Sequence, residues 1–441
     1  MTILSLELNE LNVNYIKQYA EMGYLPNFAK IIDSKLIVKT ISEPAYPYLE
    51  PWIQWPTVYT GLTQSDHGLF RLGDSDNLKS DQVWEKLEKK GFSIGAICPM
   101  NASNRCVAPD FFIPDPWTDT RLVGDKKLAD VYKIVRGLVN DNASIKFSLM
   151  HMVSLALKTC TLFKLSAFFR ILKDVPLILR YKWAKAAVLD MLFFSICIRL
   201  IDKHSSDFCS LFLNAAAHIQ HHHTFDAEVY SGEKRNPVWY SDARESGVDP
   251  LLFIYKYYDW MLGYLASRED ISVVMATGLS QLPNDVDHYQ YRIADMNGFT
   301  KLLAVDGINI KMRMSRDFLI TGGRDVLVKA QNMLGDFKVM EKPLITVDDR
   351  GDSLFCQVNY FGSPEALNNC SVYGSSLDLS EMFVLVSVEN GIHQSTGYVA
   401  DIDNILGESI KGTSSEIPLE TLHDLILGAF KNSDNHSDGA V

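Results

Sequence analysis

Cysteine is scarce in this sequence, and its arrangement excludes a scaffold held together by disulfides. The seven cysteines are spread along 441 residues, their number is odd, and none of them forms a CxxC pair. Small secreted domains that depend on disulfides show the opposite pattern, with many cysteines in a short chain. We therefore expect a protein of a reducing compartment, with the cytoplasm as its location.

Basic charge, long apolar runs and a secretion signal are also lacking. The net charge of −12 argues against general nucleic-acid binding, which needs a basic face to displace counterions. No uninterrupted apolar run reaches about 18 residues, the length that indicates a membrane-spanning helix. The first residues, Met1 to Leu8, carry no basic segment and have the pattern of a strand, so we expect no signal peptide.

What the chain does contain is an alternation of strand and helix patterns. The strand-like segments Ile3–Leu8, Leu36–Ile41 and Phe92–Cys98 are separated by helical patterns over Val13–Met22 and Ser80–Lys90. Such alternation is typical of parallel strands connected by helices. The predicted fold class is therefore α/β, with a mostly parallel central sheet and helices on both faces.

Two segments interrupt this alternation. Residues 142–205 are helical in pattern and apolar, and residues 302–380 contain short β-like pieces around one helix, as in a small α+β subdomain. The predicted organisation is a first part of the core (1–141), a helical insertion (142–205), a second part of the core (206–301), the small subdomain (302–380), a last part of the core (381–430) and a disordered polar tail (431–441).

The helical insertion admits two interpretations. Between Ser144 and Leu200 it carries nine basic residues against two acidic ones, in a chain of opposite net charge. It could simply pack on the core with its basic side chains in solvent. Alternatively, it could form a basic amphipathic surface for a polyanionic substrate or for anionic lipid, which would place the protein at the inner membrane as a peripheral partner. Oligomeric state is left open.

A cluster of histidines follows one predicted strand. Four of the eleven histidines lie between His218 and His223, directly after the apolar run Phe208–Leu213. In open α/β sheets, ligands bind beyond the carboxyl ends of the strands. The cluster therefore predicts the active cleft.

The order of several short motifs resembles the alkaline phosphatase superfamily, in particular its type I phosphodiesterase/nucleotide pyrophosphatase and sulfatase-like branch. The motifs are Thr-Gly…His-Gly within Tyr59–Gly68, Asn-x-x-x-His at Asn214–His218, Thr277-Gly278 after a buried strand, and the His-x-x-x-Gly of His393–Gly397. The resemblance covers most of the chain except the two interrupting segments. It implies an alkaline-phosphatase-like fold and a hydrolase acting on phosphate or sulfate esters.

The resemblance also implies two divalent metals, usually zinc, bound by aspartates and histidines, and this chain departs from that ligand set. Asn9 and Asn214 stand where the family has aspartates, and Thr277-Gly278 stands where it has an Asp-His pair. The nucleophile position falls on Pro51. Two-metal chemistry relies on carboxylates that offset the charge of the ions. We therefore do not expect the standard dinuclear site.

One zinc ion, or no metal, is the expectation that remains. His218 and His393 keep the family's ligand positions. His222, or alternatively His221, would complete a set of three imidazoles, which leaves a fourth coordination position open. Alternatively, His218, His221 and His393 could act as acid and base without a metal, since imidazole titrates near neutral pH.

Glu50 is a further candidate catalytic residue because it lies beside the former nucleophile position. Trp52 and Trp55 flank it, and a carboxylate with tryptophan neighbours suits a sugar site. We predict that the substrate contacts Trp52, Trp55 and the polar residues at the strand ends, which are Asn9, Glu10, Asn214 and Thr277.

Three functions follow from these observations. The favoured one is a divergent hydrolase or transferase for a phosphorylated or glycosylated substrate, such as a nucleotide-sugar or a surface-polysaccharide intermediate. The others are a catalytically inactive relative that still binds a ligand, and an ordinary two-metal phosphodiesterase.

Overall fold

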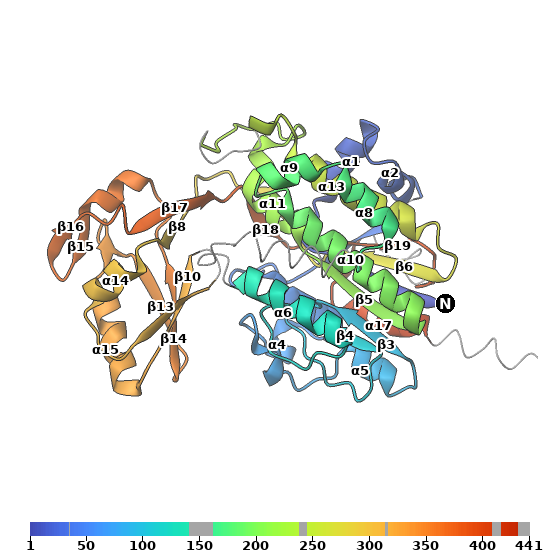
Figure 1. The fold of residues 1–441 in the computed structure, drawn as a ribbon, viewed down its shortest axis with the longest axis horizontal. Coiled ribbons are helices and arrows are strands. Elements are labelled where there is room, and N and C mark those ends of the chain that lie inside the picture. Colours follow the sequence, from blue (N-terminus) through green and yellow to red (C-terminus); the bar gives the residue numbers. More distant parts are fainter. Residues whose placement is uncertain (35, 141–161, 238–244, 314–315, 408–415, 431–441) are drawn as a thin grey trace, which may run out of the picture.

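The computed structural model describes residues 1–34, 36–140, 162–237, 245–313, 316–407 and 416–430 (Figure 1). The predicted tail 431–441 and the first part of the insertion, up to residue 161, lie outside these residues. Within the described residues, no helix is both long enough and apolar enough to span a bilayer.

The core is an eight-stranded sheet in which all but one of the strands run parallel. Ladders β1–β5, β1–β6, β3–β5, β3–β4 and β2–β20 are parallel, and only β19 pairs antiparallel with its neighbours. The predicted α/β class with a mostly parallel sheet is confirmed. In spatial order the strands are β20 (Glu416–Pro418), β2 (Ile37–Ile41), β19 (Thr396–Asp401), β6 (Ile271–Ala276), β1 (Thr2–Leu8), β5 (Phe208–Leu213), β3 (Ile94–Ile97) and β4 (Phe111–Ile113).

Helices cover both faces of this sheet, which explains why its central strands are almost continuously apolar. Every residue of β1, β5 and β6 is buried. One face packs against α1 (Val13–Glu21), α2 (Pro26–Asp33), α6 (Lys126–Asn140), α10 (Lys185–His204), α11 (Ala215–His223) and α13 (Pro250–Leu265). The other packs against α3 (Pro51–Thr60), α5 (Val83–Glu88) and α17 (Thr421–Ala429).

Short elements complete the core. Proline at the first position opens α3, as the sequence predicts, and Gly61 ends it in the left-handed region with a φ of 72°. The remaining pieces are α4 (Gln64–His67), η1 (Asp74–Asn77), α8 (Leu165–Leu172), α9 (Val175–Arg180), η2 (Thr224–Asp226), β7 (Ser280–Pro283) and β18 (Gly391–Gln394).

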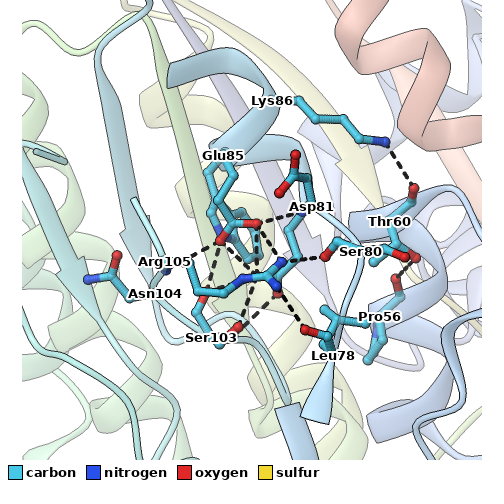
Figure 2. A network of polar contacts seen from close by, with 12 residues as sticks. Pro56, Thr60, Leu78, Ser80, Asp81, Glu85, Lys86, Ser103, Asn104 and Arg105 are labelled. Carbon is cyan, nitrogen blue, oxygen red and sulfur yellow. Dashed lines mark hydrogen bonds and ion pairs between the residues drawn. The ribbon is translucent and has the colours of Figure 1, made fainter. Parts of the chain in front are cut away.

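Gln82 is the cap residue at the start of α5, because its side chain and that of Glu85 satisfy each other's backbone N–H groups. The carboxylate of Glu85 also receives the Arg105 guanidinium, with Nη2 3.0 Å from Oε2 (Figure 2). This network fixes the loop that follows β3 against the helix.

The small subdomain stands to one side of the core and has a hydrophobic core of its own (Figure 1, orange). It is larger than predicted, because Phe383–Val388 (β17), expected in the central sheet, instead pairs antiparallel with β8. Its elements are β8 (Tyr289–Ile293), α14 (Met296–Leu303), β9 (Asn309–Met312), β10 (Asp317–Thr321), α15 (Arg324–Leu334), β11 (Lys338–Val339), β12 (Lys342–Pro343), β13 (Ile345–Asp349), β14 (Ser353–Val358), η3 (Pro364–Asn369), β15 (Cys370–Val372), β16 (Ser375–Leu377) and β17.

Candidate active site

Polar residues gather where the central strands β1, β5 and β6 end. Asn9 and Glu10 follow β1, Asn214 follows β5 and Thr277 follows β6, so parallel pairing brings them together at one edge of the sheet. Glu10 has a φ of 56°, a conformation that is uncommon for residues other than glycine. Backbone strain of this kind concentrates at functional sites.

The Glu10 carboxylate faces two imidazoles. Its Oε2 lies 3.0 Å from Nε2 of His221 and 3.2 Å from Nε2 of His393, the latter without the alignment of a hydrogen bond. Glu10 is 2% exposed. Glu10 follows β1, His221 lies in α11 and His393 lies in β18, so the three residues are far apart in the sequence. We call them the Glu10 cluster.

The other nitrogen of each imidazole is held by a backbone carbonyl. His221 Nδ1 lies 2.9 Å from the oxygen of Gly391, and His393 Nδ1 lies 3.0 Å from that of Leu49. A carbonyl oxygen can only accept a hydrogen bond, so both Nδ1 atoms carry the proton. In the neutral rings, the Nε2 lone pairs therefore point toward the same carboxylate.

Buried charges dominate the electrostatics of the cluster. Burial alone would raise the pKa of Glu10, but the facing His393 and His221 hold it well below its ordinary value. Conversely, burial would lower the pKa of His393, and the carboxylates of Glu10 and Glu50 raise it well above the ordinary value. Without a metal, the charged forms of Glu10 and His393 thus stabilise each other.

The donor set of the Glu10 cluster also fits one divalent ion. One carboxylate oxygen and two imidazole nitrogens lie within 4.8 Å of one another. Zinc and related ions accept this combination, and imidazole ligands in such sites usually donate their second N–H to a carbonyl or carboxylate, as both rings do here. Among the described residues, this is the one group of ligating side chains close enough together to share an ion.

Glu50 extends the cluster on one side. Its Oε2 lies 3.3 Å from Nδ1 of His393, so His393 stands between two carboxylates. The Glu50 side chain is 20% exposed and thus can reach solvent. The structure therefore brings together three of the four predicted catalytic residues, Glu50, His221 and His393, and adds Glu10, which was predicted to bind substrate.

His218 and His222 form a separate pair. They lie one helical turn apart on α11 with ring centroids 4.7 Å apart, whereas His221 turns toward His393 at 5.1 Å. Desolvation and the neighbouring imidazoles lower the pKa of His218 to about 4, although its side chain keeps contact with solvent. The predicted ligand set of His218, His222 and His393 is not assembled. Helix α11 instead directs His221 toward His393 of β18.

Two glutamines that the sequence analysis missed support Glu10. Gln281 lies opposite His393 in the antiparallel pair formed by β7 and β18, and its amide donates to Glu10 Oε2. Gln220 donates to the Glu10 carbonyl oxygen at 2.7 Å and accepts from the Tyr255 hydroxyl at 2.6 Å. A signal was present for Gln220, which lies inside the histidine run, but Gln281 reaches the site only through strand pairing.

Trp55 and Asn9 belong to the frame of the site. Trp55 is fully buried, and its indole N–H donates to Asn9 Oδ1 at 2.7 Å. The Asn9 amide in turn donates to Glu10 Oε1 and to Asn214 Oδ1, each at 2.8 Å. Trp55 is thus not available to stack on a sugar, contrary to its predicted role.

Trp52 and Thr277 likewise make structural contacts. The Trp52 indole N–H donates to the Phe70 carbonyl at 3.2 Å. Thr277 is fully buried, its hydroxyl accepts from the Tyr398 N–H at 2.9 Å, and its carbonyl accepts from the Glu10 N–H at 3.1 Å. Thr277 therefore positions the Glu10 backbone.

Part of the helical insertion also supports the site. Asp190 of α10 accepts from the Ala215 N–H at 2.9 Å and from the Tyr258 hydroxyl at 2.6 Å. Burial raises the pKa of Asp190 to about 6, against these hydrogen bonds. Because Asp190 caps the first turn of α11, the insertion fixes the helix that carries His221.

The small subdomain approaches the site on the side of Glu50. Burial raises the pKa of Asp317, at the start of β10, to about 6, and the negative charge of Glu50 adds to this effect. Arg71, which follows α4 in the core, binds Asp348 of β13 at 2.7 Å. These contacts place the start of β10 and the end of β13 on the Glu50 side of the site.

Comparison with known proteins gives matches among solved structures only. No protein-family model and no curated protein matches the sequence. Phosphonoacetate hydrolase from Sinorhizobium meliloti 1021 is 10% identical, with 97% of this chain and 96% of that one covered and a TM-score of 0.44. Murine ectonucleotide pyrophosphatase/phosphodiesterase 5 is 9% identical (97% and 94% covered, TM-score 0.40), and alkaline phosphatase PafA is 10% identical (96% and 94% covered, TM-score 0.40).

The name of the last contains the family that the sequence motifs resemble. At these identities and TM-scores no activity passes from those proteins to this chain, and the activities in their names are those of the proteins that bear them.

Proposed function

We propose that this chain is a hydrolase or transferase for a phosphorylated or glycosylated substrate, working with one divalent metal ion in the Glu10 cluster. The observation that carries the proposal is the convergence of Glu10 Oε2 with Nε2 of His221 and Nε2 of His393, at 3.0 and 3.2 Å. Zinc is the first candidate because its sites combine imidazole and carboxylate ligands.

The hydrogen bonds around the cluster support metal binding. Both imidazoles are oriented by Nδ1–H bonds to carbonyls, and both Nε2 atoms face Glu10, so a cation could bind these nitrogens without any rotation of the rings. Gln281 and Asn9 hold one oxygen each of the Glu10 carboxylate. When bound, the ion would supply a Lewis acid that polarises a phosphoryl or carbonyl oxygen.

Glu50 is suited to proton transfer beside this centre. It caps the start of α3 and contacts His393 Nδ1 at 3.3 Å, while its side chain keeps access to solvent. A partly exposed carboxylate next to an imidazole can take a proton from an attacking hydroxyl or water and return it to the leaving group. The contact with His393 holds this carboxylate beside the Glu10 cluster.

An anionic substrate is favoured by a basic side chain of the subdomain. The Arg316 guanidinium, just before β10, lies 4.9 Å from the centroid of the Phe361 ring, which also stacks on the His288 ring at 4.0 Å. A guanidinium beside an aromatic ring can still offer N–H groups to a phosphate or carboxylate. A nucleotide-sugar or a surface-polysaccharide intermediate would offer both an anionic group and a sugar.

A binding protein without catalysis is the second candidate. The observation in its favour is that protons alone can balance the Glu10 cluster, because Glu10 and His393 stabilise each other's charged forms. The ordinary two-metal alternative has less support, since Asn9 and Asn214 bind each other through neutral amides.

Elemental analysis of the purified, tag-free protein after zinc loading and dialysis tests the proposal. We expect about one equivalent of zinc, retained in His218→Ala and lost in His221→Ala and His393→Ala. Loss in His218→Ala would contradict this ligand set, and about two equivalents would restore the family's ordinary chemistry. Retained zinc without turnover of chromogenic phosphomonoesters, phosphodiesters or nucleotide-sugars would favour the binding protein.

A further inference from the structure

Helix α8 exposes an apolar stripe to solvent. Leu165, Phe168, Phe169 and Leu172 recur at the spacing i, i+3, i+4, i+7, and their exposed fractions are 70%, 40%, 54% and 50%. In an ordinary surface helix, residues at this spacing face the core. We call these four residues the α8 face.

The opposite side of α8 is the side that packs on the protein. Ala167 is fully buried, and the Arg170 guanidinium lies 4.1 Å from the centroid of the Tyr257 ring on α13. Lys164 forms an ion pair with Asp202 of α10, and Arg170 forms one with Asp174 at 2.5 Å. Helix α8 is thus anchored in one orientation, at the surface over α10 and α13 (Figure 1).

Positive charge surrounds the α8 face. Between Leu162 and His204 the chain has eight basic and three acidic residues. One of the acidic residues, Asp190 of α10, is buried. Lys173, directly after the helix, and Lys182 and Lys185, after α9, are exposed to solvent. Leu179 of α9 adds a further apolar side chain with 66% exposure.

We propose that the α8 face docks on an anionic lipid surface, with Lys173, Lys182 and Lys185 at the level of the headgroups. Leucine and phenylalanine on one side of a helix with lysines beside them are the features of helices that lie in the membrane interface. Each basic side chain close to such a surface adds favourable electrostatic energy. The proposal does not depend on the function proposed for the Glu10 cluster.

A second copy of this chain fits the surface less well. Two copies related by a two-fold axis would bring the same lysines of both chains together. The α8 face also consists of four side chains on eight residues, whereas stable interfaces bury about 800 Å² on each partner. A negatively charged lipid surface avoids the repulsion between like charges.

Vesicle co-sedimentation of the full-length protein tests the proposal. We expect binding to mixed phosphatidylcholine–phosphatidylglycerol vesicles at low salt, with weaker binding at high salt and on phosphatidylcholine alone. Leu165→Ser/Phe169→Ser should reduce the partition coefficient by about tenfold or more, because both side chains lose their apolar contact with lipid. Lys173→Gln/Lys182→Gln should reduce it on anionic vesicles only.

The matched control is Val107→Ser, which removes an apolar side chain with 85% exposure from another surface of the core. It should bind vesicles as the wild type does, and all variants should unfold at the same temperature because the altered side chains are exposed. Two results would overturn the proposal. One is wild-type protein that stays in the supernatant with anionic vesicles at low salt. The other is equal loss of binding in Val107→Ser.

Sedimentation velocity without lipid distinguishes the second copy. The wild type should remain the same size across concentrations. A dimer that disappears in Leu165→Ser/Phe169→Ser would assign the α8 face to self-association and contradict the lipid proposal.

Discussion

The side-chain amides of Asn9 and Asn214 bind each other across the ends of β1 and β5, at 2.8 Å. The indole N–H of Trp55 can only donate, so it fixes Oδ1 of Asn9 on its own side and Nδ2 on the side of Asn214. Two carboxylates at this separation would repel unless a cation stood between them. The two amides are neutral, so Asn9 and Asn214 pair with each other without an ion between them.

Restoring a carboxylate at position 9 should make stability depend on metal. In Asn9→Asp, the amide that donates to Asn214 and to Glu10 is lost, and a charge is placed next to Glu10 Oε1. We expect the free energy of unfolding to fall by about 1–3 kcal/mol in chelator. Added zinc should recover part of it, by binding the folded state.

Urea unfolding with chelator and with zinc measures this effect. Asn332→Asp, at an exposed position of α15, is the control and should change stability little in either condition. Equal stability of Asn9→Asp and wild type in chelator would mean that the amide pair contributes nothing.

Gln281 should tune metal affinity without being a ligand. Its amide donates to the Glu10 oxygen that faces both imidazoles, and also to the Ala217 carbonyl at 3.1 Å. Removing such a partner of a ligand typically costs about 10–100-fold in metal affinity. In Gln281→Met we expect weaker zinc binding by this factor, with unchanged stoichiometry, in a competition titration against a chromogenic chelator.

The matched control is Gln331→Met, on α15 of the subdomain, which should bind zinc as the wild type does. Unaltered affinity in Gln281→Met would show that its hydrogen bond has no influence on the carboxylate. A change in stoichiometry instead would make Gln281 part of the ligand set.

The sequence was informative about the strands and about the region of the site. Apolar runs such as Phe208–Leu213 predicted buried strands, and parallel pairing then dictated that Asn9, Asn214 and Thr277 meet. The histidine run could be recognised as a site because it follows such a strand. Local pattern and sheet topology together were sufficient for this much.

The choice among the histidines could not be predicted from the sequence. His218, His221 and His222 differ in the direction in which their side chains leave α11. Which of them joins the site depends on where the paired strands β7 and β18 lie. Spacing alone allowed His218 to share a helix face with either His221 or His222. Strand β18 places Gly391 and His393 beside His221. This contact joins distant parts of the chain.

Glu50 should act on turnover and leave metal binding intact. Its carboxylate contacts His393 Nδ1 rather than the Nε2 that faces Glu10. In Glu50→Gln we expect kcat to fall about 100-fold or more on whichever substrate the screen identifies, since the amide cannot take a proton. Zinc content should equal that of the wild type.

The pH–rate profile separates catalysis from substrate binding. Loss of the limb that depends on a base is expected in Glu50→Gln, whereas a change in KM with an unaltered profile would indicate a binding role. The control variant is Glu43→Gln, a carboxylate on the segment that leads to Glu50 for which the proposed chemistry has no use. Full activity of Glu50→Gln would exclude it from proton transfer.

Glu7 should make the folded core more stable as the pH falls toward 5. Its carboxylate is buried inside β1, where it accepts from Tyr59 at 2.7 Å and Ser210 at 2.8 Å. Burial raises its pKa from 4.5 to about 7, against the opposing effect of these hydrogen bonds. Between these two values the folded protein holds a proton that the unfolded chain releases.

The sign follows from this difference. As the pH falls from above 7 to below 4.5, the folded state takes up its proton first, so the cost of burying the charge is relieved by about 3 kcal/mol. In Glu7→Gln no charge is buried at any pH. The variant should therefore gain stability relative to the wild type at pH 8 and lose most of this advantage at pH 5.

Urea unfolding of both proteins in chelator measures the difference, with Glu21→Gln on the surface of α1 as the control. A difference that is constant across this range would show that Glu7 stays ionised in the folded core at both pH values.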